Sequence, residues 1–167
     1  MTFFYKKLDI SGKNVAITGA AGSIGSKVAF EMAELGANIA LVDINSEGLK
    51  NILDKIKNNK DENIIIKSDL TKPDEVRNAF QSISKSWGSI DVLINCIGTF
   101  GSGKEAENLN EFDWDKDIDI NLKSVFFCCK EACNQMKKNN YGKIINFSSQ
   151  SGYNYIKGTP KTIYIVI

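Results

Sequence analysis

A turn rich in glycine follows the first apolar segment of this 167-residue chain. Gly19, Gly22 and Gly25 lie in the segment Thr18–Gly25, directly after a run typical of a strand and directly before a helical pattern. Glycines at such a junction let the backbone turn tightly and approach a pyrophosphate, which then meets the free N–H groups and the positive dipole end of the helix. A plain tight turn is the alternative interpretation, and the strand–turn–helix context favours a phosphate site. The cofactor contacts expected from this turn are Gly19, Ser23, Ile24 and Gly25.

An acidic residue, Asp43, ends the second predicted strand, 18 residues beyond Gly25. A carboxylate at this position can accept hydrogen bonds from the hydroxyls of an adenosine ribose, and it repels a 2′-phosphate. Its neighbours Ile44 and Asn45 provide no arginine that would bind such a phosphate. The sequence therefore predicts NAD rather than NADP as cofactor, and a solvated acid that merely closes a strand is the alternative.

Histidine is absent from the sequence. This excludes Ser-His-Asp and Cys-His catalysis and the zinc sites that need an imidazole ligand, and we expect no metal. The four cysteines are Cys96, Cys128, Cys129 and Cys133. Because no apolar segment typical of a signal peptide follows Lys6 and Lys7, we expect free thiols in a reducing cytoplasm. Small buried side chains are the favoured interpretation of these cysteines, and a metal or redox pair is the alternative.

Bulk composition excludes several classes of protein. A net charge of +1 gives no electrostatic reason to bind nucleic acid or an anionic membrane. The longest apolar runs, Val125–Cys129 and Ile163–Ile167, are far shorter than the ~20 residues of a membrane span. The length predicts one domain with its own core.

Short apolar runs alternate with amphipathic segments along the chain. The predicted strands are Asn14–Thr18, Asn38–Asp43, Asn63–Ser68, Asp91–Cys96 and Lys143–Phe147. Unbroken aliphatic runs of this kind suit strands that are covered on both faces, as in a parallel sheet. The alternation predicts an α/β fold with a doubly wound, Rossmann-type parallel sheet that stops after its fifth strand.

Helical periodicity predicts the buried faces of the intervening segments. The first apolar stripe ends at Gly36, a C-terminal cap, and the third begins near Pro73. The four stripes are Ile24, Val28, Met32 and Leu35; Leu49, Ile52, Leu53 and Ile56; Val76, Phe80 and Ile83; and Leu122, Val125, Phe126, Cys129, Cys133 and Met136.

Taken together, the motifs of the chain resemble those of the short-chain dehydrogenases/reductases. Besides the glycine turn, the similar segments are Asp9–Lys13 before the first strand, Ser68–Thr71 after the third, Asn95–Gly98 after the fourth, Trp114–Ser124 and Ile144–Gly152. The resemblance implies that Asp69 and Leu70 contact the adenine and that Asn95 and Gly98 belong to the cofactor site. It further implies a small-molecule substrate and the homo-oligomer that is usual in the family.

The same resemblance implies a catalytic set of Ser149, Tyr164 and Asn121. The Ser-x-x-Gly spacing selects Ser149 over Ser148, and Tyr164 lies 15 residues beyond it. In the family's chemistry the tyrosine exchanges a proton, the serine holds the substrate oxygen and the asparagine anchors a water. From the residues alone, Ser149 can instead cap a loop, Asn121 can be an ordinary helical residue, and Tyr164 can belong to a strand.

The chain also departs from the family pattern. Ser23 stands where the short branch usually has glycine or alanine, and the spacing of the glycines also fits the extended branch that contains sugar-nucleotide epimerases. The lysine of the family's Tyr-x-x-x-Lys motif would be the residue after Ile167. We therefore expect residues 1–167 to form one NAD-binding domain, incomplete at its C-terminus, with impaired activity. The alternatives are an NAD-binding module without catalysis and a fragment of an extended-branch epimerase.

Overall fold

Five parallel strands form one sheet in the order β3-β2-β1-β4-β5. The computed structural model describes residues 10–57 and 62–149. The strands are β1 (Asn14–Thr18), β2 (Asn38–Asp43), β3 (Ile64–Lys67), β4 (Val92–Asn95) and β5 (Lys143–Asn146). The direction of winding reverses between β1 and β4, which pair in parallel register. This confirms the predicted doubly wound α/β sheet, and such a reversal leaves a crevice beyond the carboxyl ends of the two strands.

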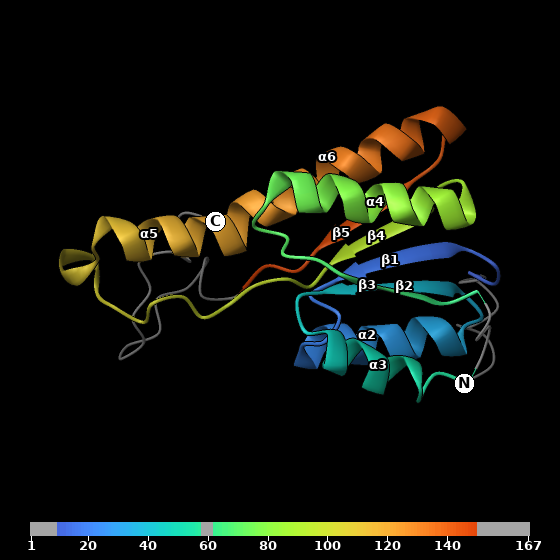
Figure 1. Ribbon diagram of the computed structural model, residues 1–167, viewed down its shortest axis with the longest axis horizontal. Coiled ribbons are helices and arrows are strands. Elements are labelled where there is room, and N and C mark those ends of the chain that lie inside the picture. The colour runs from blue at the N-terminus through green and yellow to red at the C-terminus, as the bar shows by residue number, and fades with distance from the viewer. Residues whose placement is uncertain (1–9, 58–61, 150–167) are drawn as a thin grey trace.

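Helices cover both faces of the sheet. α2 (Ser23–Glu34) and α3 (Ser46–Leu53) lie on one face, and α4 (Pro73–Trp87) and α6 (Ser124–Met136) lie on the other (Figure 1). α5 (Glu111–Ile118) extends past the carboxyl ends of the strands and continues into α6 through η2 (Asp119–Lys123). The remaining short helices are η1 (Ala106–Asn108) and η3 (Lys137–Asn139). No helix in residues 10–57 or 62–149 is long and apolar enough to cross a bilayer.

The strand ends agree with the predicted ones for β1 and β2, whereas the predicted β3, β4 and β5 are too long. The residues that flank β3 on its two sides also bond to β2, one through its side chain and the other through its backbone. The Asn63 side-chain Oδ1 accepts from the Ile39 N–H at 2.7 Å, and the Ser68 N–H donates to the Asp43 carbonyl at 3.0 Å. At the start of β3 a side-chain oxygen thus accepts the hydrogen bond that a backbone carbonyl would accept within a strand, and no local sequence pattern predicts this exchange of acceptors.

The buried face of α2 differs from the predicted stripe. Ile24 is 52% exposed, while Gly25, Ala29 and Ala33 are buried, one turn apart. Small side chains on this face allow the helix to approach the sheet closely. The larger Val28 and Met32 only flank the contact. The predicted glycine lies at the end of the helix, because Gly36 follows the C-cap residue Leu35 with a φ of +87°.

The same correction applies to α6. Its buried residues are Ser124, Cys128, Ala132 and Met136, whereas Phe126 is 60% exposed. Leu122, at the start of the predicted stripe, is exposed as well. Met136, the last residue of the predicted stripe, is buried as predicted. In the rest of the helix the prediction favours large side chains, whereas close packing against α4 and the sheet selects small ones.

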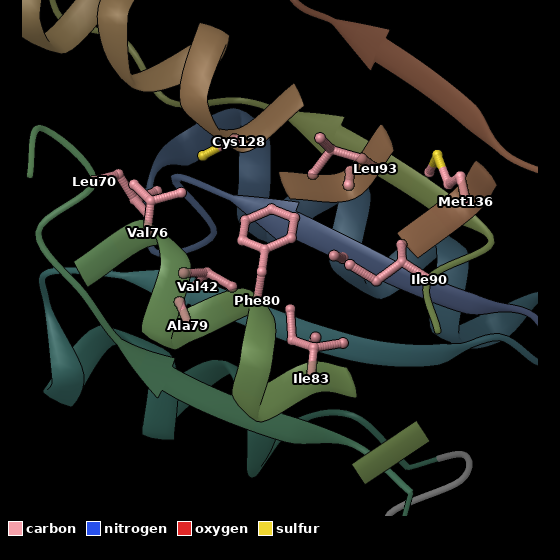
Figure 2. Packing of buried hydrophobic residues seen from close by; sticks show 13 residues of the cluster. Val42, Leu70, Val76, Ala79, Phe80, Ile83, Ile90, Leu93, Cys128 and Met136 are labelled. Carbon is pink, nitrogen blue, oxygen red and sulfur yellow. The ribbon is translucent and has the colours of Figure 1, made fainter. Parts of the chain in front are cut away.

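The stripes predicted for α3 and α4 are confirmed. Leu49, Ile52 and Ile56 are buried on the α2 side of the sheet. On the other side, Phe80 points from α4 into the core and lies among Val76, Ile83 and Leu93 (Figure 2). Pro73 is the first residue of α4, where its missing N–H leaves no helical hydrogen bond unmade.

Candidate functional site

Two joined clefts run along the carboxyl ends of the strands. The first, of about 270 Å³, lies over β1, β2 and β3, and the second, of about 310 Å³, lies over β4 and β5. Both are lined by Cys96, Ile97 and Gly98, which follow β4. The first is also lined by Gly19, Gly22, Asp43, Ile44, Ser68, Asp69, Leu70, Thr71 and Ile120; the second by Ile24, Thr99, Phe100, Asn121, Phe147, Ser148 and Ser149.

The glycine turn connects β1 to α2 with two close backbone approaches. Gly19 has a φ of +64°, and a Cβ there would lie 2.7 Å from the Cα of Ile97. A Cβ on Gly25 would lie 2.3 Å from the carbonyl oxygen of Gly19. Neither position accepts a side chain without movement of the backbone. α2 begins at Ser23, so Ser23, Ile24 and Gly25 provide the N–H groups that a helix leaves without intrahelical acceptors.

Asp43 is fixed at the end of β2 by two backbone N–H groups. Its Oδ2 accepts from Ala21 at 3.0 Å, and its Oδ1 accepts from Asn45 at 2.9 Å. The first bond attaches the carboxylate to the glycine turn, 22 residues earlier in the chain. Asp43 is therefore not a freely solvated acid, and each oxygen keeps a second lone pair that can accept from a ligand.

Asp69 lies in the first cleft, but its side chain is bonded to the start of α4. Its Oδ1 accepts from the Thr71 hydroxyl at 2.7 Å and from the Thr71 N–H at 3.1 Å, and its Oδ2 pairs with Lys72 at 3.2 Å. The Thr71 hydroxyl, with Lys72, holds the pKa of the Asp69 carboxyl below its ordinary value. Leu70 is buried beside it.

Three of the predicted cofactor residues, Ser23, Gly25 and Asn95, line neither cleft, and Asn95 is the one whose side chain is buried. It is 1% exposed and does not line either cleft. Its Oδ1 accepts from the Thr18 hydroxyl at 2.8 Å, and its Nδ2 donates to Asn146 Oδ1 at 2.8 Å. The Cys129 thiol completes the cluster, 3.4 Å from Asn95 Nδ2 and 3.6 Å from Asn146 Oδ1. Burial raises the pKa of this thiol above its ordinary value.

This polar cluster was missed by the sequence analysis, although the sequence contains a signal for it. Thr18, Asn95 and Asn146 are the last or nearly last residues of three apolar strands, and each lies directly opposite its neighbour in the register. A polar residue at the same end of each adjacent strand indicates a cross-strand hydrogen-bonded row. The row joins β1, β4 and β5 at their carboxyl ends.

Asn121 and Ser149 both line the second cleft. Asn121 lies in the π-helical segment η2, which joins α5 to α6. Its Oδ1 accepts from the Thr99 N–H at 2.8 Å, and its Nδ2 donates to the Asp117 carbonyl at 3.0 Å. Single π-helical turns within α-helices are frequent at functional sites. Tyr164 lies outside the described residues.

The family model for short chain dehydrogenase matches residues 13–161. The 3beta-hydroxysteroid dehydrogenase of Mediterraneibacter gnavus is 34% identical over 140 residues, which are 84% of this chain and 50% of that protein. The 3-oxoacyl-(acyl-carrier-protein) reductase FabG of Rickettsia conorii is 36% identical over 153 residues, 92% of this chain and 59% of that one. The chain thus spans between half and three fifths of these relatives.

Solved structures resemble the whole described fold. A short-chain type dehydrogenase/reductase from Mycobacterium marinum has a TM-score of 0.88 at 30% identity, over 97% of this chain and 66% of that one. An NAD⁺-bound xylitol dehydrogenase has a TM-score of 0.83 at 31% identity, over 93% of this chain and 58% of that one.

Proposed function

The chain belongs to the short-chain dehydrogenase/reductase family, and from this premise we propose that it acts as an NAD-dependent oxidoreductase on a hydroxyl/ketone pair of a small molecule. The observation that carries the proposal is the pair of joined clefts. One contains the glycine turn, Asp43 and Asp69, and the other contains Asn121 and Ser149. A dinucleotide that spans both would bring its reactive ring beside the polar side chains of the second cleft.

Two features of the described residues fit a dinucleotide in the first cleft. The absence of side chains at Gly19 and Gly25 lets the backbone of the turn pack closely, and the turn leads to the N-terminus of α2, where a pyrophosphate is favoured. Ser68 also lines this cleft, and its hydroxyl is buried without a hydrogen-bond partner among the described residues. A buried hydroxyl is rarely left unpaired, so we propose that a polar atom of the bound adenosine is its partner.

We propose NAD over NADP because of the charge at Asp43. The carboxylate is held by the Ala21 and Asn45 N–H groups, and it cannot swing away from a ligand without breaking both hydrogen bonds. None of the described residues that line the first cleft is lysine or arginine. A 2′-phosphate would therefore meet a fixed negative charge with no cation to neutralise it.

The second cleft provides the groups that act on the substrate. NAD, when bound, supplies the hydride acceptor. In this proposal the Ser149 hydroxyl holds the substrate oxygen, and Asn121 anchors a water that carries protons from the cleft. Asn121 is suited to this role because both ends of its amide are already fixed, by Thr99 and by Asp117. Tyr164 is the proposed proton donor and acceptor.

A nucleotide-binding module without catalysis is the second candidate, and the same observation supports it, because the first cleft is formed within the described residues. Affinity for NAD without turnover would favour this candidate. The cytoplasm as compartment and a homo-oligomeric state remain predictions.

Calorimetric titration with NAD and NADP tests the proposal directly. We expect tighter binding of NAD, and we expect Asp43→Asn to reduce the preference, since the amide has no charge to repel a phosphate. Asp54→Asn, on the surface after α3, is the matched control. Turnover is then measured with a secondary-alcohol panel that includes a 3β-hydroxysteroid, a 3-hydroxyacyl thioester and xylitol. Tighter binding of NADP by the unaltered chain would contradict the cofactor assignment.

A further inference from the structure

The loop after β4 is attached to α5 and η2 at three points. The Thr99 N–H donates to Asn121 Oδ1 at 2.8 Å, and the Ser102 N–H donates to Asp117 Oδ2 at 2.8 Å. Further along, the Lys104 ammonium pairs with Asp113 Oδ2. The three acceptors are four residues apart, so they form a row along one side of the helical segment. The loop of residues 98–104 therefore runs along this row, with its backbone held against the helical segment.

Asp117 is the buried member of the row. It is 2% exposed, although most aspartates of folded proteins lie at the surface. The loop backbone is shaped to reach it: Gly101 has a φ of +79°, and a Cβ there would lie 2.8 Å from Asp117 Oδ2. A buried carboxylate without a donor is strongly unfavourable, so the Ser102 hydrogen bond favours the closed position of the loop.

The attached loop forms one wall of the second cleft. Thr99 and Phe100 both line this cleft, and Phe100 is 56% exposed. Its position is fixed from both sides, by the Thr99 bond that precedes it and the Ser102 bond that follows it. Of the loop residues 98–104, only Gly98 lines the first cleft. The carboxylates of the first cleft, Asp43 and Asp69, are held by residues outside this loop.

We propose that Asp117 is a positioning residue that fixes the loop of residues 98–104, with Phe100, as a wall around the nicotinamide end of the dinucleotide. The inference rests on the proposed function, because it takes the second cleft as the nicotinamide end. It implies that Asp117 affects the affinity for a complete dinucleotide and leaves the affinity for the adenosine end unchanged.

Calorimetric titration of the 167-residue chain with NADH and with ADP measures this asymmetry. We expect Asp117→Ala to weaken NADH binding about tenfold and ADP binding less than twofold. Asp117→Asn keeps an oxygen that accepts from the Ser102 N–H, so its affinity for NADH should stay within about threefold of the unaltered chain. Asp115→Ala is the control, because it removes the same charge from an exposed position of α5.

Gly101→Ala provides an independent variant that leaves the buried charge in place. Its new Cβ displaces the loop from Asp117, so the selective loss of NADH affinity should recur. The rate of amide hydrogen exchange in residues 99–104 measures, without any nucleotide, how firmly the loop is held against α5. The exchange should accelerate in Asp117→Ala and Gly101→Ala but not in Asp115→Ala.

The outcomes separate the two proposals. If NADH and ADP both fail to bind the unaltered chain, the proposed function is wrong and the affinity claim for Asp117 falls with it. If both bind but Asp117→Ala weakens them equally, or leaves NADH unchanged, the positioning role alone is wrong. Unchanged exchange of residues 99–104 in both loop variants would also overturn it.

Discussion

Replacing Gly25 by alanine tests the close packing of the glycine turn against α2. A Cβ at this position would lie 2.3 Å from the Gly19 carbonyl oxygen and 2.9 Å from the Cα of Ala20. Both neighbours are backbone atoms, so no side-chain rotation relieves the contact and the helix must move away from the turn. Gly22, three residues earlier, is the matched control, because its Cβ would lie 3.2 Å from the same carbonyl oxygen.

The expected magnitude follows from these contacts. Forcing an extra carbon into a packed site destabilises proteins by about 1–3 kcal/mol, and a contact this short with rigid backbone belongs at the upper end. The better helix propensity of alanine offsets about 1 kcal/mol at most. We therefore expect Gly25→Ala to lower the free energy of unfolding by about 2 kcal/mol, or about 4–8 °C in Tm. Gly22→Ala should lower it by less than about 1 kcal/mol.

Urea unfolding followed by tryptophan fluorescence measures this difference, and titration with NAD measures the site. The displaced turn should reduce NAD affinity in Gly25→Ala. In Gly22→Ala the fold should persist while NAD affinity falls, because the backbone of Gly22 faces the first cleft. Equal unfolding free energies for the two variants would refute the argument, since it depends on the difference between the two contacts.

Three further predictions concern the polar cluster, the cysteine between the clefts and the acid beside α4. Asn95→Leu should lower the unfolding free energy by about 2 kcal/mol, because it leaves the Thr18 hydroxyl buried without its acceptor, and adding Thr18→Val should restore part of that loss in urea unfolding. Burial raises the pKa of Cys96 to about 11, so its alkylation by iodoacetamide should be slow at pH 8 and should accelerate up to about pH 11. Because Cys96 lines the first cleft, bound NAD should slow the alkylation further. An alkylation rate equal to that of a free cysteine peptide would contradict this prediction. The pKa of Asp69 is lowered in the folded state, so the ionised carboxylate stabilises the fold above its unfolded pKa, near 4, and this contribution is lost as the pH falls through the folded pKa. Asp69→Asn should therefore make Tm depend less steeply on pH between pH 2 and 6.

Much of the fold and part of the site follow from local patterns. Alternation of aliphatic runs and helical segments predicted the sheet, because a strand covered on both faces must be apolar throughout. The placement of Gly19, Gly22 and Asp43 along one cleft also follows from the chain order, since parallel strands bring their carboxyl ends to one edge. Asn121 and Ser149 share the second cleft, as the family resemblance implied. Their roles remain predictions.

Other features depend on contacts between distant residues. The Thr18–Asn95 and Asn95–Asn146 hydrogen bonds join residues 77 and 51 positions apart, and they direct into the core an amide that the motif assigned to the cofactor site. Hydrophobicity alone also selected the wrong faces of α2 and α6, because the closest helix–sheet contacts need small side chains.

The sequence by itself determined how strands and helices alternate along the chain and where the glycine turn lies. These features depend on periodicity and backbone freedom within a few neighbouring residues. Only the tertiary structure decided that η2 is a π-helical segment and that Asp117 is buried against the loop beyond Gly98. A carboxylate in an amphipathic helix is predicted to face water. Its burial becomes favourable only when the fold brings a backbone N–H from another segment to its side chain, and no local pattern contains that donor.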